Sequence, residues 1–77
     1  MYTITIYDIS KKKFRSYQHI SSIEYLQPFD DDWTKVSGEE ILSHHFPSGA
    51  GYHLMSDTGN YSIGSSLVGL IEIEKEH

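Results

Sequence analysis

The stretch YTITIY, residues 2–7, decides how this chain is expected to fold. Tyr2, Ile4 and Ile6 lie on one face of an extended backbone, while two threonines and a tyrosine occupy the other. β-branched and aromatic side chains favour a pleated strand over a helix. The stretch therefore predicts a β-strand with one face turned toward a core.

The sequence on both sides of this strand predicts an antiparallel sheet. Residues 8–12 have the composition of a turn, and residues 14–18 are expected to return as a second strand, so that residues 2–18 form a β-hairpin. The strand after this hairpin is expected to end before Pro28, because proline has no N–H to donate to the hydrogen bonds of a central strand. The further strands are expected at residues 20–26, 51–56, 61–63 and 67–74.

One short helix interrupts the strands. Ser37 and Glu40 have the spacing of a capping box, and Pro47 is expected to stop the helix, which is predicted over residues 38–45. The predicted fold class is α+β, with an antiparallel sheet of five or six strands and one short helix.

Length and composition limit the possible functions. The 77 residues suit one domain, 1–77, and contain no cysteine, so the fold could be reinforced only by a histidine and carboxylate metal site or by oligomerisation. A net charge of −5 disfavours direct nucleic-acid binding and allows a basic protein surface as partner, although ordinary solubility accounts for the same charge. No apolar run reaches the ~20 residues of a membrane span, and the N-terminus lacks a signal-peptide pattern. A cytoplasmic protein that does not contact membranes is expected.

Histidines supply the strongest chemical signal. His44, His45 and His53 lie within ten residues of one another, and Asp57 follows, so these four side chains are candidate ligands of a structural zinc ion. Two features oppose a tight site: adjacent histidines point ~100° apart on a helix, and His53 and Asp57 lie ~13 Å apart on an extended strand. Other ligands could come from His19, Asp30, Asp31 or Asp32. The alternative is that these are surface or hydrogen-bonded histidines.

No pattern in the chain indicates an enzyme. Cysteine nucleophiles are absent, and so are a Gly-x-Ser-x-Gly elbow and a His-Glu-x-x-His motif. A domain of this size also has little room for a substrate pocket. A non-enzymatic protein is therefore expected.

Acidic and aromatic side chains are the candidate contact residues. The candidate partner-binding carboxylates are Asp30, Asp31, Asp32, Glu39, Glu40, Glu72 and Glu74. Trp33 is expected to bury its ring and anchor the end of the acidic loop. The six tyrosines suit either a protein interface or cross-strand pairs that stabilise the sheet. The carboxylates are equally compatible with an ordinary solvated surface.

In size, acidity, and lack of cysteine and catalytic motifs, the chain resembles the short anti-CRISPR proteins of phages and mobile elements that inhibit type II RNA-guided nucleases. The histidine group at His44, His45 and His53 adds to this resemblance, since some small inhibitors of this kind are zinc-stabilised. The resemblance implies an inhibitor that occupies a basic lobe of the nuclease and blocks loading of guide or target DNA. It also implies the cytoplasm of a host cell as the location.

Two other functions fit the same composition. The chain could be a small regulatory or structural module without metal, acting as a monomer or as a small homo-oligomer through an open sheet edge. It could also be a toxin or antitoxin fragment.

Overall fold

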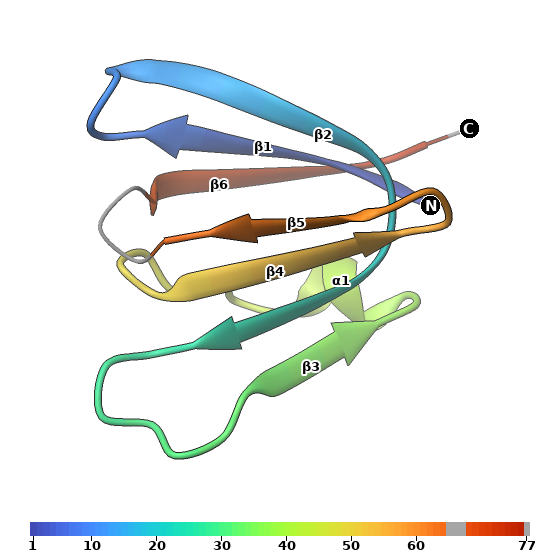
Figure 1. Cartoon of the computed structure of the whole chain (residues 1–77). Coiled ribbons are helices and arrows are strands. Elements are labelled where there is room, and N and C mark those ends of the chain that lie inside the picture. Colours follow the sequence, from blue (N-terminus) through green and yellow to red (C-terminus); the bar gives the residue numbers. More distant parts are fainter. Residues whose placement is uncertain (65–67, 77) are drawn as a thin grey trace.

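The chain folds into an antiparallel sheet that curls over onto itself, in a computed structural model that describes residues 1–64 and 68–76 (Figure 1). Within those residues the elements are β1 (Tyr2–Asp8), β2 (Lys13–Leu26), β3 (Thr34–Ser37), α1 (Glu40–Ser43), β4 (Gly51–Ser56), β5 (Asn60–Ile63) and β6 (Val68–Lys75). The prediction of an antiparallel sheet with one short helix is confirmed in outline, although α1 is one turn and the fold is mostly β. The predicted start of the last strand, at 67, lies outside the described residues.

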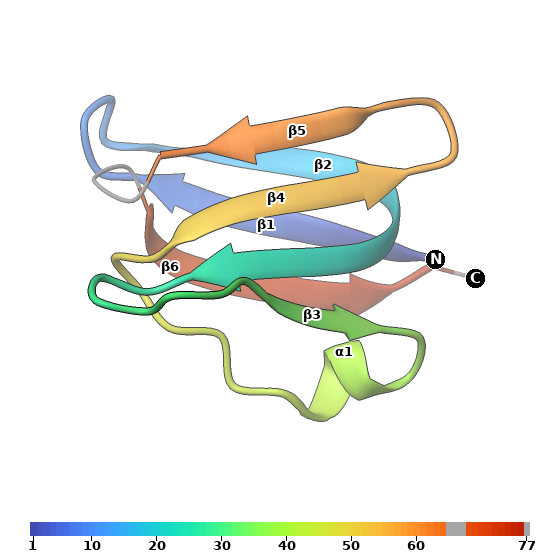
Figure 2. The ribbon, with the colours of Figure 1, turned by 60° about the horizontal axis from the view of Figure 1, so that its bottom comes forward.

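Strand β2 is 14 residues long and organises the sheet. The strand order is β5-β4-β2-β1-β6, and β3 also pairs with β2. The first half of β2 pairs with β1, from Lys13 opposite Asp8 to Ile20 opposite Tyr2. Its second half pairs with both β3 and β4. Figures 1 and 2 show β2 curving round one side of the molecule between these halves, which folds the sheet into two facing layers.

The prediction of separate strands at residues 14–18 and 20–26 is wrong, because β2 is continuous through both. At the bend His19 takes a φ of +60°, and the register with β4 shifts between Ile20 and Ser22. A bulge of this kind breaks the alternation of apolar and polar side chains. In the sequence, that break has the same appearance as the end of a strand.

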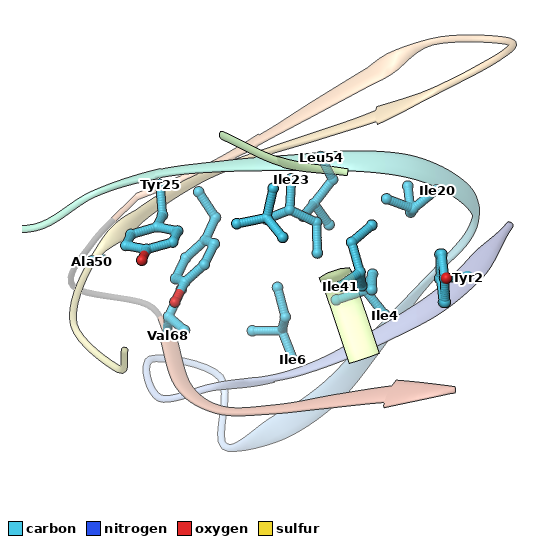
Figure 3. Packing of buried hydrophobic residues seen from close by; sticks show 12 residues of the cluster. Tyr2, Ile4, Ile6, Ile20, Ile23, Tyr25, Ile41, Ala50, Leu54 and Val68 are labelled. Carbon is cyan, nitrogen blue, oxygen red and sulfur yellow. The ribbon is translucent and has the colours of Figure 1, made fainter. Parts of the chain in front are cut away.

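The core lies between the two layers (Figure 3). The predicted inward face of β1 is confirmed, since Tyr2, Ile4 and Ile6 are all buried. Among the residues that the structure describes, the other buried apolar ones are Ile20, Ile23, Tyr25, Val36, Ile41, Ala50, Tyr52, Leu54 and Val68.

The helix is shorter than predicted, and its capping box is not formed. Ser37 belongs to β3, Glu39 is the N-cap residue, and no side chain caps the helix. Gly38 turns the chain between β3 and α1 with a φ of +63°, a conformation that glycine adopts without strain. The helix ends at Ser43, and the backbone of the C-cap residue His44 is already extended, with φ −82° and ψ 143°. The predicted range of 38–45 is therefore too long at both ends, because it includes residues of the turn before α1 and of the loop after it.

Candidate docking site

The histidines predicted as zinc ligands lie on different parts of the fold. His44 contacts the core-facing ring of Tyr25, with 2.6 Å between its Nε2 and the tyrosine hydroxyl oxygen. His53 lies on β4 between Tyr52 and Leu54, which face the core, so its side chain is on the opposite face of the sheet. The two imidazoles therefore do not face a common ion.

His45 and Asp57 are both exposed, and the latter lies in the turn between β4 and β5. Across the described part of the chain, no three histidine or carboxylate side chains lie close enough to hold a metal ion. The zinc site stays a prediction, and it would require these side chains to move together. Elemental analysis of the purified chain tests it, and less than ~0.2 zinc per chain would remove it.

His44 instead belongs to an aromatic cluster with Tyr25, Phe46 and Tyr52. The ring centroids of Tyr25 and His44 are 5.5 Å apart, and those of His44 and Phe46 are 4.8 Å apart. The Tyr52 hydroxyl donates a hydrogen bond to the Pro47 carbonyl oxygen. Burial raises the pKa of the Tyr52 phenol above its usual value, and the neighbouring Tyr25 adds to the shift. The contacts of this cluster hold the loop after α1 against the sheet.

The Tyr52 phenol is expected to make the fold sensitive to alkali. Because its pKa is higher in the folded chain than the ordinary value of 10.0, its contribution is complete below pH 10 and is lost as the pH rises further. Tyr52→Phe is expected to cost about 1 kcal/mol at neutral pH, through loss of the hydrogen bond. Thermal melts from pH 7 to pH 12 check this, and the variant is expected to lose less stability above pH 10 than the parent. Equal losses in both proteins would contradict it.

The seven predicted contact carboxylates are all exposed, but they occupy three places. Glu72 and Glu74 lie on β6, opposite Thr5 and Thr3 of β1. Glu39 and Glu40 lie at the start of α1. The three aspartates, Asp30, Asp31 and Asp32, lie in the loop between β2 and β3. The acidic loop and the helix start lie at opposite ends of β3, so they do not form one continuous patch.

The acidic loop begins with a turn that displays Phe29. The Asp30 N–H donates to the Gln27 carbonyl oxygen at 3.1 Å, and Pro28 and Phe29 are the two central residues. Phe29 has a φ of +74°, which fits the third position of a type II turn. Glycine or asparagine normally occupies that position, because a side chain there costs about 1–2 kcal/mol. The phenylalanine ring is fully exposed to solvent, at 103%.

Trp33 closes the loop and is 49% exposed, so the prediction that it buries its ring is wrong. Its ring edge lies beside Gly51: a Cβ added to Gly51 would be 4.0 Å from the Cη2 atom of Trp33. Together with Leu26, Pro28 and Ile63, both aromatic rings line an open groove beside the acidic loop.

Strained backbone and exposed apolar side chains both concentrate at functional surfaces. The segment from Phe29 to Trp33 combines the two with carboxylates. Asp30 also has a structural role, because its Oδ2 accepts from the Gln27 N–H at 3.3 Å. Asp31 and Asp32 are exposed carboxylates of the same loop. We call residues 29–33 the docking loop.

A second unpredicted feature joins the C-terminal end of β6 to the bend in β2. The Glu76 carboxylate accepts from the His19 N–H at 2.8 Å and from the Thr3 hydroxyl at 2.8 Å, and it pairs with the His19 ring at 3.0 Å. The His19 backbone bond, more than any other contact, lowers the pKa of Glu76. These bonds hold Glu76 against both β1 and β2.

Comparisons with protein-family models, with curated proteins and with solved structures found no match. Within the described chain, no helix has the length and apolar character needed to cross a membrane. The function of the docking loop is therefore inferred from its own geometry.

Proposed function

We propose that the chain is a non-enzymatic protein-binding module that docks on a basic protein surface through its docking loop. The observation that carries the proposal is Phe29, an apolar ring held fully in solvent by an unfavourable backbone conformation beside exposed carboxylates. Aromatic anchors surrounded by polar groups dominate the energetics of protein interfaces. Asp31 and Asp32 would then meet cationic side chains at the rim.

A type II RNA-guided nuclease is the partner that the resemblance implies, and its basic channels have the required charge. Occupancy of such a channel would prevent loading of guide or target DNA without any catalysis by this chain. The cytoplasm of a host cell is the corresponding location. A regulatory module that binds another basic protein would use the same contact chemistry.

Phe29→Gly separates docking from folding. Glycine adopts the positive φ without strain, but it also gives the unfolded chain more conformational entropy. Because these two effects oppose each other, the free energy of unfolding is expected to stay within about 1 kcal/mol of the parent value. Loss of the aromatic anchor is expected to weaken binding at least about tenfold. The measurement is inhibition of DNA cleavage by a purified type II nuclease over a range of inhibitor concentrations, with the inhibitor added before the guide and, in a second series, after it.

Leu42→Ala is the control, because Leu42 is also an exposed apolar residue, at 50%, but lies on α1, outside the docking loop. This variant is expected to inhibit as well as the parent. Equal inhibition by Phe29→Gly and the parent chain would refute the docking loop, and absence of inhibition by the parent would refute the nuclease as partner.

A further inference from the structure

One end of the molecule exposes large apolar side chains from two separate segments. The turn between β1 and β2 and the docking loop both lie at this end, on the left of Figures 1 and 2. Within the described residues, the exposed apolar side chains near these segments are Ile9, Phe14, Phe29, Trp33 and Leu70, each at least 49% exposed. In Figure 1 the turn lies at the top and the docking loop at the bottom of this end, and each exposes apolar side chains of the kind that mark interaction surfaces.

The side chains near the β1–β2 turn form a continuous patch across three strands. Tyr7 lies opposite Phe14 on β2 and Leu70 on β6. The Tyr7 and Phe14 rings meet edge to face, with centroids 5.1 Å apart. Ile9 packs over Gly69, where an added Cβ would lie 2.9 Å from its Cγ1. We call Tyr7, Ile9, Phe14 and Leu70 the hairpin patch.

The segment that carries part of the hairpin patch is basic, whereas the rest of the chain is acidic. Residues 9–19 contain Lys11, Lys12, Lys13 and Arg15 and no carboxylate, so this segment carries +4. Since the whole chain carries −5, the other residues together carry −9. Among the described residues, the one ion pair joins His19 to Glu76. The three lysines of the turn therefore have no carboxylate partner within ion-pair distance in the described structure.

We propose that the hairpin patch binds the docking loop of a second copy of this chain. Phe29 of one copy would cover the apolar patch of the other, while Asp31 and Asp32 face the turn lysines. Both segments lie at the same end, so a two-fold axis brings each loop onto the other copy's hairpin and closes the assembly at two copies. The inference rests on the proposed function, because it names a partner for the same docking loop.

Charge complementarity favours a second copy over the other occupants of a basic, apolar surface. An anionic membrane or a nucleic acid would attract the turn lysines, but the three aspartates at the same end would repel it. A second copy satisfies both charged segments at once. The contact area is limited by a molecule measuring 32 × 29 × 23 Å, so a weak, reversible dimer is expected. Because the dimer occupies the docking loop, it would compete with any other basic partner.

Complementary charge swaps test the dimer. Sedimentation of the parent chain from about 10 µM to about 1 mM is expected to show a shift from 8.8 kDa toward twice that mass. Lys12→Asp/Lys13→Glu and Asp31→Lys/Asp32→Lys place like charges across the contact, so each variant alone is expected to stay monomeric. An equal mixture of the two variants restores opposite charges at both contacts and is expected to dimerise. Glu72→Lys/Glu74→Lys, which changes the net charge by the same amount as Asp31→Lys/Asp32→Lys but at another place, is expected to dimerise like the parent.

A parent chain that stays monomeric over this range would overturn the dimer. So would a mixture that stays monomeric, or single variants that dimerise like the parent. The nuclease assay with Phe29→Gly tests the docking loop independently of the dimer. A monomeric chain whose inhibition depends on Phe29 would refute only the dimer.

Discussion

Ile41→Ala is expected to lower the free energy of unfolding by about 3 kcal/mol, the middle of the range for isoleucine-to-alanine changes in a packed core. Ile41 is 0% exposed and is the one buried residue of α1. The helix is a single turn, so its own hydrogen bonds contribute little and this side chain holds it against the sheet. Domains of this length are stable by roughly 4–12 kcal/mol, so the loss is a large part of the total.

Leu42→Ala is the matched control, because the neighbouring Leu42 is 50% exposed on the same helical turn. It is expected to cost less than about 1 kcal/mol, since much of its side chain already contacts water. Urea unfolding followed by tyrosine and tryptophan fluorescence gives both values. Similar losses in the two variants would show that Ile41 does not anchor α1 in the core.

The sequence predicts those parts of the fold that depend on local pattern. β1 is found because apolar and polar side chains alternate from Tyr2 to Tyr7 without interruption, and the pairing of β1 with β2 follows from the short turn. β3 is not predicted from the sequence because it has only four residues, with Lys35 and Val36 in the middle. Such a segment has too few alternating positions for a period, and its strand conformation comes from pairing with the second half of β2.

The bend in β2 and the contacts around it depend on residues far apart in the chain. His19 adopts its positive φ where Glu76 accepts its N–H, and 57 residues separate the two. Proximity in the sequence also groups His44 with His53, but the sheet separates them onto opposite faces. Spacing alone does not report such a separation, because it follows from which face of β4 meets the core.

The docking loop is only partly predictable from the sequence. Its three aspartates are evident, but the exposure of Phe29 and Trp33 is not, because large aromatic side chains are usually buried. The available signal is the order Gln27-Pro28-Phe29-Asp30, in which proline precedes a residue that a type II turn would place at positive φ. That signal depends on the turn type, which the sequence alone leaves open.

Asp31→Lys/Asp32→Lys is expected to weaken binding to a basic partner by about tenfold to a hundredfold and to reduce its dependence on salt. Both carboxylates are exposed in the docking loop, so under the proposed function they approach the partner's cations early and steer the encounter. The effect should be greatest at low salt. At 0.1 M ionic strength the Debye length is ~10 Å, so dissolved ions already weaken the attraction between the two proteins. Nuclease inhibition measured at several salt concentrations gives both quantities.

Glu72→Lys/Glu74→Lys separates a local contact from the effect of net charge. It changes the charge of the chain by the same amount as the aspartate variant, but the two glutamates lie on β6, outside the docking loop. If the loop makes the contact, the glutamate variant should retain most of the parent affinity. If the two variants lose affinity equally, the attraction comes from the overall acidity of the chain, and Phe29 alone would remain to define a specific site.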